Sequence, residues 1–211
     1  MGLQSAFDLE LSSDPEAILR RIRAMIVQQL IAATRTHRHP WHLGTVASCE
    51  GNRPRSRTVV LRAVQDEPLI LRFHTDKRSM KTGQLAANPN VEWLFYEPST
   101  RIQLRVGCSA EVVSSGDEWS HAWEKTSLAS RRCYLGPFAP GSITEGASHN
   151  LPGHLFDRDP THEESLPGAE NFVIVRCAVE ELEWLYLKHS GHLRCRFAKS
   201  GELWSENWIA P

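Results

Sequence analysis

The chain has 211 residues, of which 41% are hydrophobic and 23% are charged, with 24 Lys+Arg against 25 Asp+Glu. This size and composition suit one folded domain, 1–211, and exclude general disorder, while the near-neutral charge argues against a protein built mainly to bind nucleic acid. No apolar run reaches the roughly 18 residues of a membrane-spanning helix, and no secretory signal is visible, so we expect a soluble cytoplasmic protein.

The first predicted element is a helix at about residues 14–36. Ser13-Asp14-Pro15-Glu16 supplies an N-cap, a proline in the first turn and an early acid. Apolar residues then recur at helical spacing, which predicts one buried face made of Ile18, Leu19, Ile22, Met25, Ile26 and Leu30.

Short runs of period two follow and predict strands at 42–48, 57–64, 69–74, 91–96, 101–113, 172–179, 183–188, 193–197 and 203–209. We expect short helices at 79–87 and 116–126. Residues 49–54 and 136–168 are predicted to be loops, the second a long one rich in Gly, Pro, Ser and His. Many short strands with few helices favour a mainly β (α+β) fold, built as an antiparallel barrel.

Positive charge is concentrated between Arg53 and Lys81, where eight basic residues face three acidic ones. Such a cluster is often only a solvated basic surface, but it also suits an anionic partner. Ser79 and Lys81 stand at the start of a predicted helix, where phosphate binds readily. Because the glycine-rich nucleotide motifs are absent, side chains and a helix start would have to hold the phosphate.

Several motifs in one order resemble the pyridoxamine 5'-phosphate oxidase-related FMN-binding family: Arg57-Thr58-Val59-Val60-Leu61-Arg62, Phe73-His74-Thr75-Asp76-Lys77-Arg78-Ser79-Met80-Lys81, Asn88-Pro89, Phe95-Tyr96, Gln103 before Gly107, and Trp208-Ile209-Ala210-Pro211. The resemblance implies an FMN-binding split β-barrel with an N-terminal helix and short peripheral helices. It also implies a homodimer that holds FMN at the interface.

The resemblance also implies roles for individual residues. The family's phosphate and ribityl contacts fall on Arg57, Arg62, Thr75, Ser79 and Lys81, with His74 in the same motif. The flavin ring would be lined by Thr58, Val59, Val60 and Leu61. Gln103 would lie near the isoalloxazine, and Trp184 and Arg196 would reach FMN across the dimer. His192 and Arg194 match the catalytic pair that contacts an anionic substrate.

Some positions depart from the family pattern. Arg62 stands where lysine is common, and His192-Leu193-Arg194 replaces an Arg-x-His pair. Residues 123–131 resemble the substrate-phosphate strip only loosely. FMN binding is therefore the firmer expectation. The specific hypothesis is oxidation of an amine donor resembling pyridoxamine or pyridoxine phosphate, with hydride transfer to FMN and reoxidation by oxygen.

Alternatives remain open at this point. The same barrel could serve an FMN-dependent reductase that uses NAD(P)H, or a flavin-binding protein without turnover. Nucleic-acid binding is disfavoured because Phe73 is the only aromatic residue in the basic segment. We expect no metal, since His37, His39 and His42 have no matching acid or cysteine cluster. The five scattered cysteines indicate reduced thiols.

Overall fold

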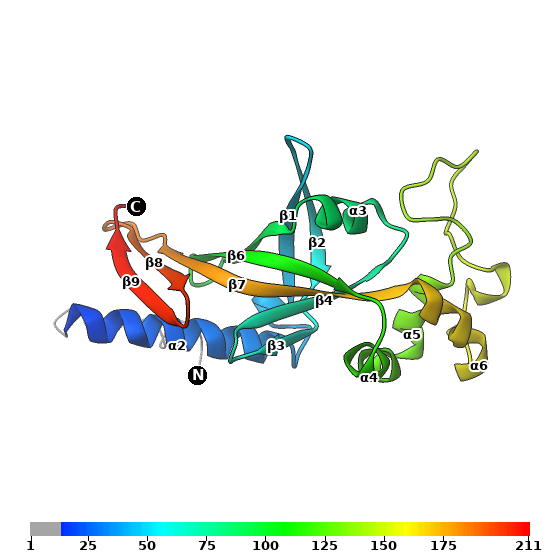
Figure 1. The fold of residues 1–211 in the computed structure, drawn as a ribbon, viewed down its shortest axis with the longest axis horizontal. Helices are drawn as coiled ribbons and strands as arrows, with labels where there is room; N and C mark the ends of the chain where they lie inside the picture. Colours follow the sequence, from blue (N-terminus) through cyan, green and yellow to red (C-terminus); the bar gives the residue numbers. More distant parts are fainter. Residues whose placement is uncertain (1–13) are drawn as a thin grey trace.

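The computed structural model describes residues 14–211 (Figure 1). Helix α2 spans Pro15–Ala33, which confirms the predicted N-terminal helix. The Asp14 side chain accepts a hydrogen bond from the backbone N–H of Glu16 at 3.1 Å and so caps the helix. Its apolar stripe, including Ile22 and Ile26, is fully buried against the sheet.

The strands form one nine-stranded antiparallel sheet that does not close, in the order β2-β1-β5-β6-β7-β4-β3, with β8 on β7 and β9 on β8. This confirms the mainly β, split-barrel fold. The strands are β1 (Leu43–Glu50), β2 (Arg53–Val60), β3 (Ala63–Gln65), β4 (Ile70–Asp76), β5 (Asn90–Glu97), β6 (Ile102–Val113), β7 (Phe172–Tyr186), β8 (Leu193–Ser200) and β9 (Leu203–Ile209). The predicted loop at 49–54 is shorter than expected, because β2 begins at Arg53.

Strand β7 is one strand of 15 residues where the sequence predicts two. A bulge explains the difference. Gly107 of β6 pairs with Glu181, but the next residue, Cys108, pairs with Val179, so Glu180 is an extra residue. The extra residue moves the buried positions from the odd to the even numbers, and the core side chains are Val175, Cys177 and Val179, then Leu182 and Trp184.

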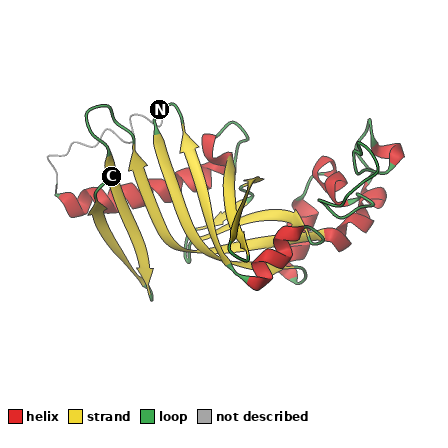
Figure 2. Ribbon diagram, turned by 90° about the horizontal axis from the view of Figure 1, so that it is seen from above, coloured by secondary structure: helices red, strands yellow, loops and turns green. Residues whose placement is uncertain are grey.

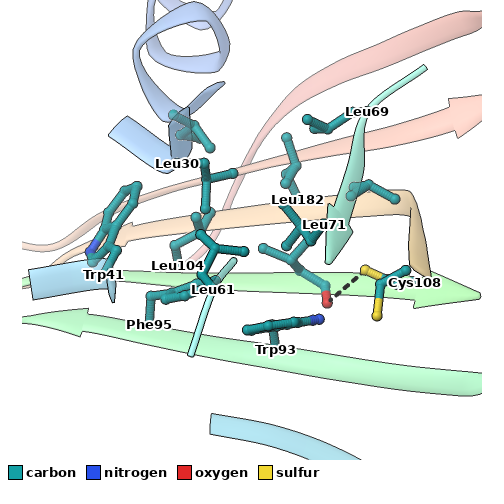
Figure 3. Close-up of a cluster of buried hydrophobic side chains, with 14 of the residues drawn as sticks. Leu30, Trp41, Leu61, Leu69, Leu71, Trp93, Phe95, Leu104, Cys108 and Leu182 are labelled. Atoms are coloured by element: carbon teal, nitrogen blue, oxygen red, sulfur yellow. Dashed lines mark hydrogen bonds between the residues drawn. The ribbon is translucent and has the colours of Figure 1, made fainter. Parts of the chain in front are cut away.

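The core lies between α2 and the inner face of the sheet (Figures 2 and 3). Leu30 from the helix meets Leu61 and Trp41 there. The rings of Trp93 and Phe95 stack at 5.4 Å with an angle of 13° between their planes. Gly44 leaves room for this pair, because a Cβ at that position would lie 2.6 Å from Phe95.

Short helices gather in a lobe at the end of the sheet that is far from the β8–β9 hairpin (Figures 1 and 2). They are α4 (Asp117–Lys125), α5 (Leu128–Arg131), α6 (His162–Ser165) and the 3₁₀ turns η2 (Arg132–Tyr134), η3 (Gly153–Leu155) and η4 (Leu166–Asn171). The prediction of a structureless loop at 136–168 is therefore wrong in part. Thr161 and Glu164 form a capping box that starts α6.

The lobe has a small core of its own, formed by Trp123, Tyr134, Phe172 and Ile174. A further helix, α3 (Met80–Ala87), follows β4 and packs beside β1, where a helix was predicted at 79–87. Among residues 14–211, no helix is both long and apolar enough to cross a membrane.

Candidate functional site

A groove of about 700 Å³ lies between β2 and the start of α3. The strands that border the groove, β2 and β4, are held in place by antiparallel pairing with β1 and β7, respectively. The side of the groove facing α3 is polar and cationic, whereas β2 offers a mixed surface. Most residues of the two longest sequence motifs line it, namely Arg57, Thr58, Val59, Val60, Arg62, His74, Thr75, Ser79, Met80 and Lys81.

Lys81 and two hydroxyls form the polar centre of this groove. The Nζ atom of Lys81 donates hydrogen bonds to Thr75 Oγ1 at 2.8 Å and to Ser79 Oγ at 3.0 Å. Both hydroxyl residues are buried. Ser79 is the N-cap residue of α3, yet its side chain makes no capping hydrogen bond. Its hydroxyl is thus turned to Lys81 and not to the backbone of the helix.

Arg57 is held beside Lys81 by contacts from two elements. It donates to Ser48 Oγ on β1 at 2.7 Å and to Gln84 Oε1 on α3 at 2.9 Å. Burial lowers the pKa of Arg57. Burial, followed by the nearby charge of Arg57, lowers the pKa of Lys81. Two partly desolvated cations side by side make this a place where an anion is stabilised.

Acidic partners neutralise much of the remaining basic segment. Asp76, which is buried, accepts from the guanidinium of Arg78 at 2.7 Å, and Arg78 also donates to the carbonyl of Gly136 at 2.9 Å. Arg72 pairs with Glu118 at 2.7 Å, an acid that lies outside the segment. The number of basic residues in this segment therefore overstates its unpaired positive charge. Among residues 14–211, the cations of the segment that form no ion pair include Arg57, Lys81 and Arg62.

A second cavity of about 590 Å³ adjoins the groove, and Arg62 and His74 line both. Strand β2 ends at Val60, so Arg62 lies in the connection to β3 and not in a continuous strand. The His74 ring packs edge-on against Phe172 at 4.7 Å. Burial, together with the charge of Arg62, lowers the pKa of His74 to about 4, so the imidazole is neutral at pH 7.

The far wall of this second cavity comes from the lobe and includes Lys125, Thr126, Ser127 and Ser130. Arg131, from the strip that loosely resembles a substrate-phosphate site, points elsewhere. Its guanidinium is buried, donates to the carbonyls of Thr126 and Trp123 at 3.0 and 2.9 Å, and lies 4.5 Å from the Trp123 ring centroid. Arg131 therefore joins α4 to α5 and leaves Lys125 as the cation of this wall.

Two residues that hold Arg57 in place were not predicted from the sequence. Ser48 and Gln84 hold Arg57 and each other, with Ser48 Oγ donating to Gln84 Oε1 at 2.7 Å. A signal did exist for Gln84, because it follows Lys81 by three residues and so shares one face of α3. Conversely, Leu61 lies in the core with no exposed surface, and of the expected ring-lining residues only Thr58, Val59 and Val60 face the groove.

The remaining predicted residues lie away from the groove of the same chain. Gln103 is on β6, and Arg194 and Arg196 are on β8, towards the other end of the sheet (Figure 1). His192 precedes β8, where its Nδ1 accepts from the backbone N–H of Lys188 at 3.2 Å. Trp184 is fully buried, because the strand alternation behind the bulge turns it into the core.

Gln103, Arg194 and Arg196 share one exposed face of the sheet. Gln103 pairs with Leu185, and Leu185 pairs with Arg194, so the three lie side by side on that face. Leu94 pairs with Arg105 in the neighbouring row. Large apolar side chains are exposed there as well: Leu94 is 39% and Tyr96 46% exposed.

The histidines near the end of α2 have structural contacts. His39 Nε2 is 3.0 Å from Gln29 Oε1, and His42 Nδ1 is 2.8 Å from the carbonyl of Ala33. In residues 14–211 no three His, Cys, Asp or Glu side chains gather in a way that could hold a metal ion.

Comparison with known proteins finds similarity to pyridoxine/pyridoxamine 5'-phosphate oxidases. Residues 21–114 match the family model described as pyridoxamine 5'-phosphate oxidase, FMN-binding domain. Pyridoxine/pyridoxamine 5'-phosphate oxidase 2 of Arabidopsis thaliana is 33% identical over 97 residues, which are 43% of this chain and about half, 48%, of that protein. Pyridoxine/pyridoxamine 5'-phosphate oxidase of Deinococcus deserti is 28% identical over 177 residues, covering 82% of this chain and 81% of that protein.

Solved structures support the same fold. A pyridoxamine 5'-phosphate oxidase-related, FMN-binding protein from Nostoc punctiforme is 25% identical, with a TM-score of 0.72 over 95% of this chain and 100% of that one. PhzG from Burkholderia lata, in complex with tetrahydrophenazine-1-carboxylic acid, is 19% identical, with a TM-score of 0.59 over 96% and 95% of the two chains. At that identity the second likeness concerns the fold alone.

Proposed function

We propose that this chain, whose residues 21–114 match the family model of the pyridoxamine 5'-phosphate oxidase FMN-binding domain, is an FMN-dependent oxidoreductase acting on a small anionic amine. The arrangement of Lys81, Arg57, Thr75 and Ser79 carries this proposal. These groups make a cationic, hydroxyl-lined cradle whose nearest buried acid, Asp76, is paired with Arg78. Such a cradle suits one phosphate group.

The groove also fits the rest of the cofactor. Its volume of about 700 Å³ lies within the usual range for small-molecule sites. Beyond the cationic end, the groove is bordered by Val59 and Val60 on β2, which suit an apolar ring system. Lys81, Arg57, Thr75 and Ser79 would hold the phosphate, and the β2 segment would lie along the flavin. When bound, FMN would supply the hydride acceptor that no side chain can provide.

The adjoining cavity is the proposed substrate site. Arg62 and Lys125 line it, and neither forms an ion pair with another residue in 14–211. Two unpaired cations beside Ser127 and Ser130 favour a substrate with a phosphate or carboxylate group. Arg62 and His74 face both cavities, so they would hold the substrate next to the cofactor. A neutral imidazole at His74 can accept a hydrogen bond from a substrate ammonium or hydroxyl group.

We further propose a homodimer through the exposed face of the sheet. Leu94 and Tyr96 supply exposed apolar surface there, and Gln103, Arg194 and Arg196 lie on the same face. A second copy on this face would offer Gln103 and Arg196 to the partner's flavin and His192 and Arg194 to its substrate. Replacing Tyr96 with Asp should therefore convert dimer to monomer in sedimentation analysis and lower the FMN content. A dimer that persists in this variant contradicts the proposed interface.

Turnover is the test of the activity. The relatives from Arabidopsis and Deinococcus are named as pyridoxine/pyridoxamine 5'-phosphate oxidases, so these two phosphates are the first probes. FMN-loaded protein should consume oxygen with at least one of them. If neither is oxidised while the protein still binds FMN, the oxidase proposal fails and the cofactor assignment stands. Oxidation of NADH or NADPH alone would support a reductase in its place.

A further inference from the structure

Four charged side chains of alternating sign cross four neighbouring strands on the exposed face of the sheet. They are Glu92 on β5, Arg105 on β6, Glu183 on β7 and Arg194 on β8, and we call them the charge ladder. Arg105 donates to both oxygens of Glu92 at 2.7 Å, and its other terminal nitrogen lies 3.3 Å from Glu183 Oε1. Arg194 Nη2 lies 2.8 Å from the same Glu183 oxygen.

Glu183 is the centre of the ladder, since it alone contacts both arginines. Its side chain is only 9% exposed although it belongs to the open face, whereas Glu92 at the outer end is 42% exposed. Arg194 has few other contacts: its Nε atom is buried and has no hydrogen-bond partner among residues 14–211. Glu183 is therefore the group that fixes the direction of the Arg194 guanidinium.

Stability alone is a weak reason for this arrangement. Burying a carboxylate carries a desolvation penalty that the ion pair offsets only in part, and apolar residues often stabilise such positions equally well. A free arginine, by contrast, samples many rotamers, and holding it in one of them prepares it for a planar anionic group. The ladder has the form expected when the direction of one arginine matters.

We propose that Glu183 is a positioning residue that orients Arg194 towards an anionic substrate bound in the partner subunit. This inference rests on the proposed function, which places Arg194 over the partner's substrate cavity. Glu183 itself would touch neither cofactor nor substrate. Its contribution would pass through Arg194, with Arg105 holding Glu183 from the other side.

The test compares Glu183→Gln with Glu92→Gln in the FMN-loaded dimer. Glu92→Gln is the matched control, because it weakens the ladder at its exposed end and leaves the contact between Glu183 and Arg194 intact. With pyridoxine 5'-phosphate as the probe, Glu183→Gln should raise KM about five- to tenfold and change kcat less than about twofold, as expected when a charge-assisted contact is misdirected and not removed. Glu92→Gln should leave both within about twofold of the unaltered protein.

A double-mutant cycle completes the experiment. Adding Glu183→Gln to Arg194→Ala should raise KM no further, because the positioning effect has nothing left to act on. Additive effects, or equal KM values for Glu183→Gln and Glu92→Gln, overturn the proposal.

The Arg194 Nε–H signal in ¹⁵N NMR can be measured without substrate. It therefore distinguishes failure of this inference from failure of the proposed function. A signal that broadens or shifts in Glu183→Gln but not in Glu92→Gln supports the ordering. An unchanged signal overturns this inference and leaves the proposed function untouched. If the ordering holds but Arg194→Ala has normal kinetics, the placement of Arg194 in the proposed function is at fault, and the inference falls with it.

Discussion

Replacing Lys81 with methionine should separate phosphate binding from flavin-ring binding. Methionine keeps the length of the side chain but removes the charge that lies 2.8 Å from Thr75 Oγ1 and 3.0 Å from Ser79 Oγ. A hydrogen bond to a charged group contributes about 1.5–3 kcal/mol, so the FMN dissociation constant should rise about 10- to 150-fold. Riboflavin lacks the phosphate, and its affinity should hardly change.

The fold should tolerate this substitution. Removing the ammonium group loses two hydrogen bonds to hydroxyls, worth about 1 kcal/mol each. The loss is opposed by relief of the burial and of the repulsion from Arg57, both of which lower the pKa of Lys81. We therefore expect the free energy of unfolding of the FMN-free protein to change by no more than about 1 kcal/mol.

Flavin fluorescence titration with FMN and with riboflavin measures both affinities. Lys77→Met is the control, because Lys77 lies in the same turn but is exposed. The decisive quantity is the riboflavin dissociation constant divided by the FMN dissociation constant. This ratio should fall strongly in Lys81→Met and stay unchanged in Lys77→Met. If this ratio is the same in Lys81→Met and in the unaltered protein, Lys81 does not hold the phosphate and our placement of the cofactor is wrong.

Three further predictions follow from the packing. Gly44→Ala should destabilise the protein by about 1–3 kcal/mol in urea denaturation, since the new Cβ would lie 2.6 Å from Phe95; an unchanged midpoint contradicts that close approach. Between pH 6.5 and 4, His74 is protonated in the unfolded chain but not in the folded one, so the free energy of unfolding should fall with decreasing pH, by up to about 3 kcal/mol at pH 4. His74→Phe should remove this part of the dependence of stability on pH. An unaltered dependence would show that His74 is not responsible. Arg131→Met should cost about 1.5–3 kcal/mol and expose the lobe to proteolysis while leaving FMN affinity unchanged; a loss of FMN affinity with normal stability would give Arg131 a binding role.

Local sequence pattern predicted the elements well where one physical cause dominates. The apolar stripe of α2 and the alternation of the strands depend on burial, which periodicity reports directly. The bulge at Glu180 was not predicted. In the sequence it appears only as a break in the alternation, which also suits the end of one strand and the start of another. In the lobe, α4 was predicted at 116–126, but α5, α6 and the 3₁₀ turns were missed, since they depend on caps such as Thr161 and on long-range packing against Phe172.

The candidate site divides in the same way. Lys81, Thr75 and Ser79 come together because one turn and one helix start join them, so a local motif was sufficient. The neutralisation of Arg72 was beyond local reasoning, since its partner Glu118 lies 46 positions later in the chain and meets it only in the folded sheet. The role of Arg131 was similarly hidden, because its hydrogen-bond acceptors are main-chain carbonyls that carry no side-chain signature.

Strand β7 fixes the spacing between the second cavity and the charge ladder. It contains both Ile174, on the wall of the proposed substrate cavity, and Glu183 of the charge ladder, which are about 30 Å apart at the rise of an extended strand. Deleting Glu180, the extra residue of the bulge, would restore regular alternation and keep Glu183 on the exposed face, whereas deleting one residue from a regularly paired part of the strand would turn the later side chains to the opposite face. The spacing between the proposed substrate cavity and the proposed dimer face is therefore set by the length of β7 together with the bulge at Glu180.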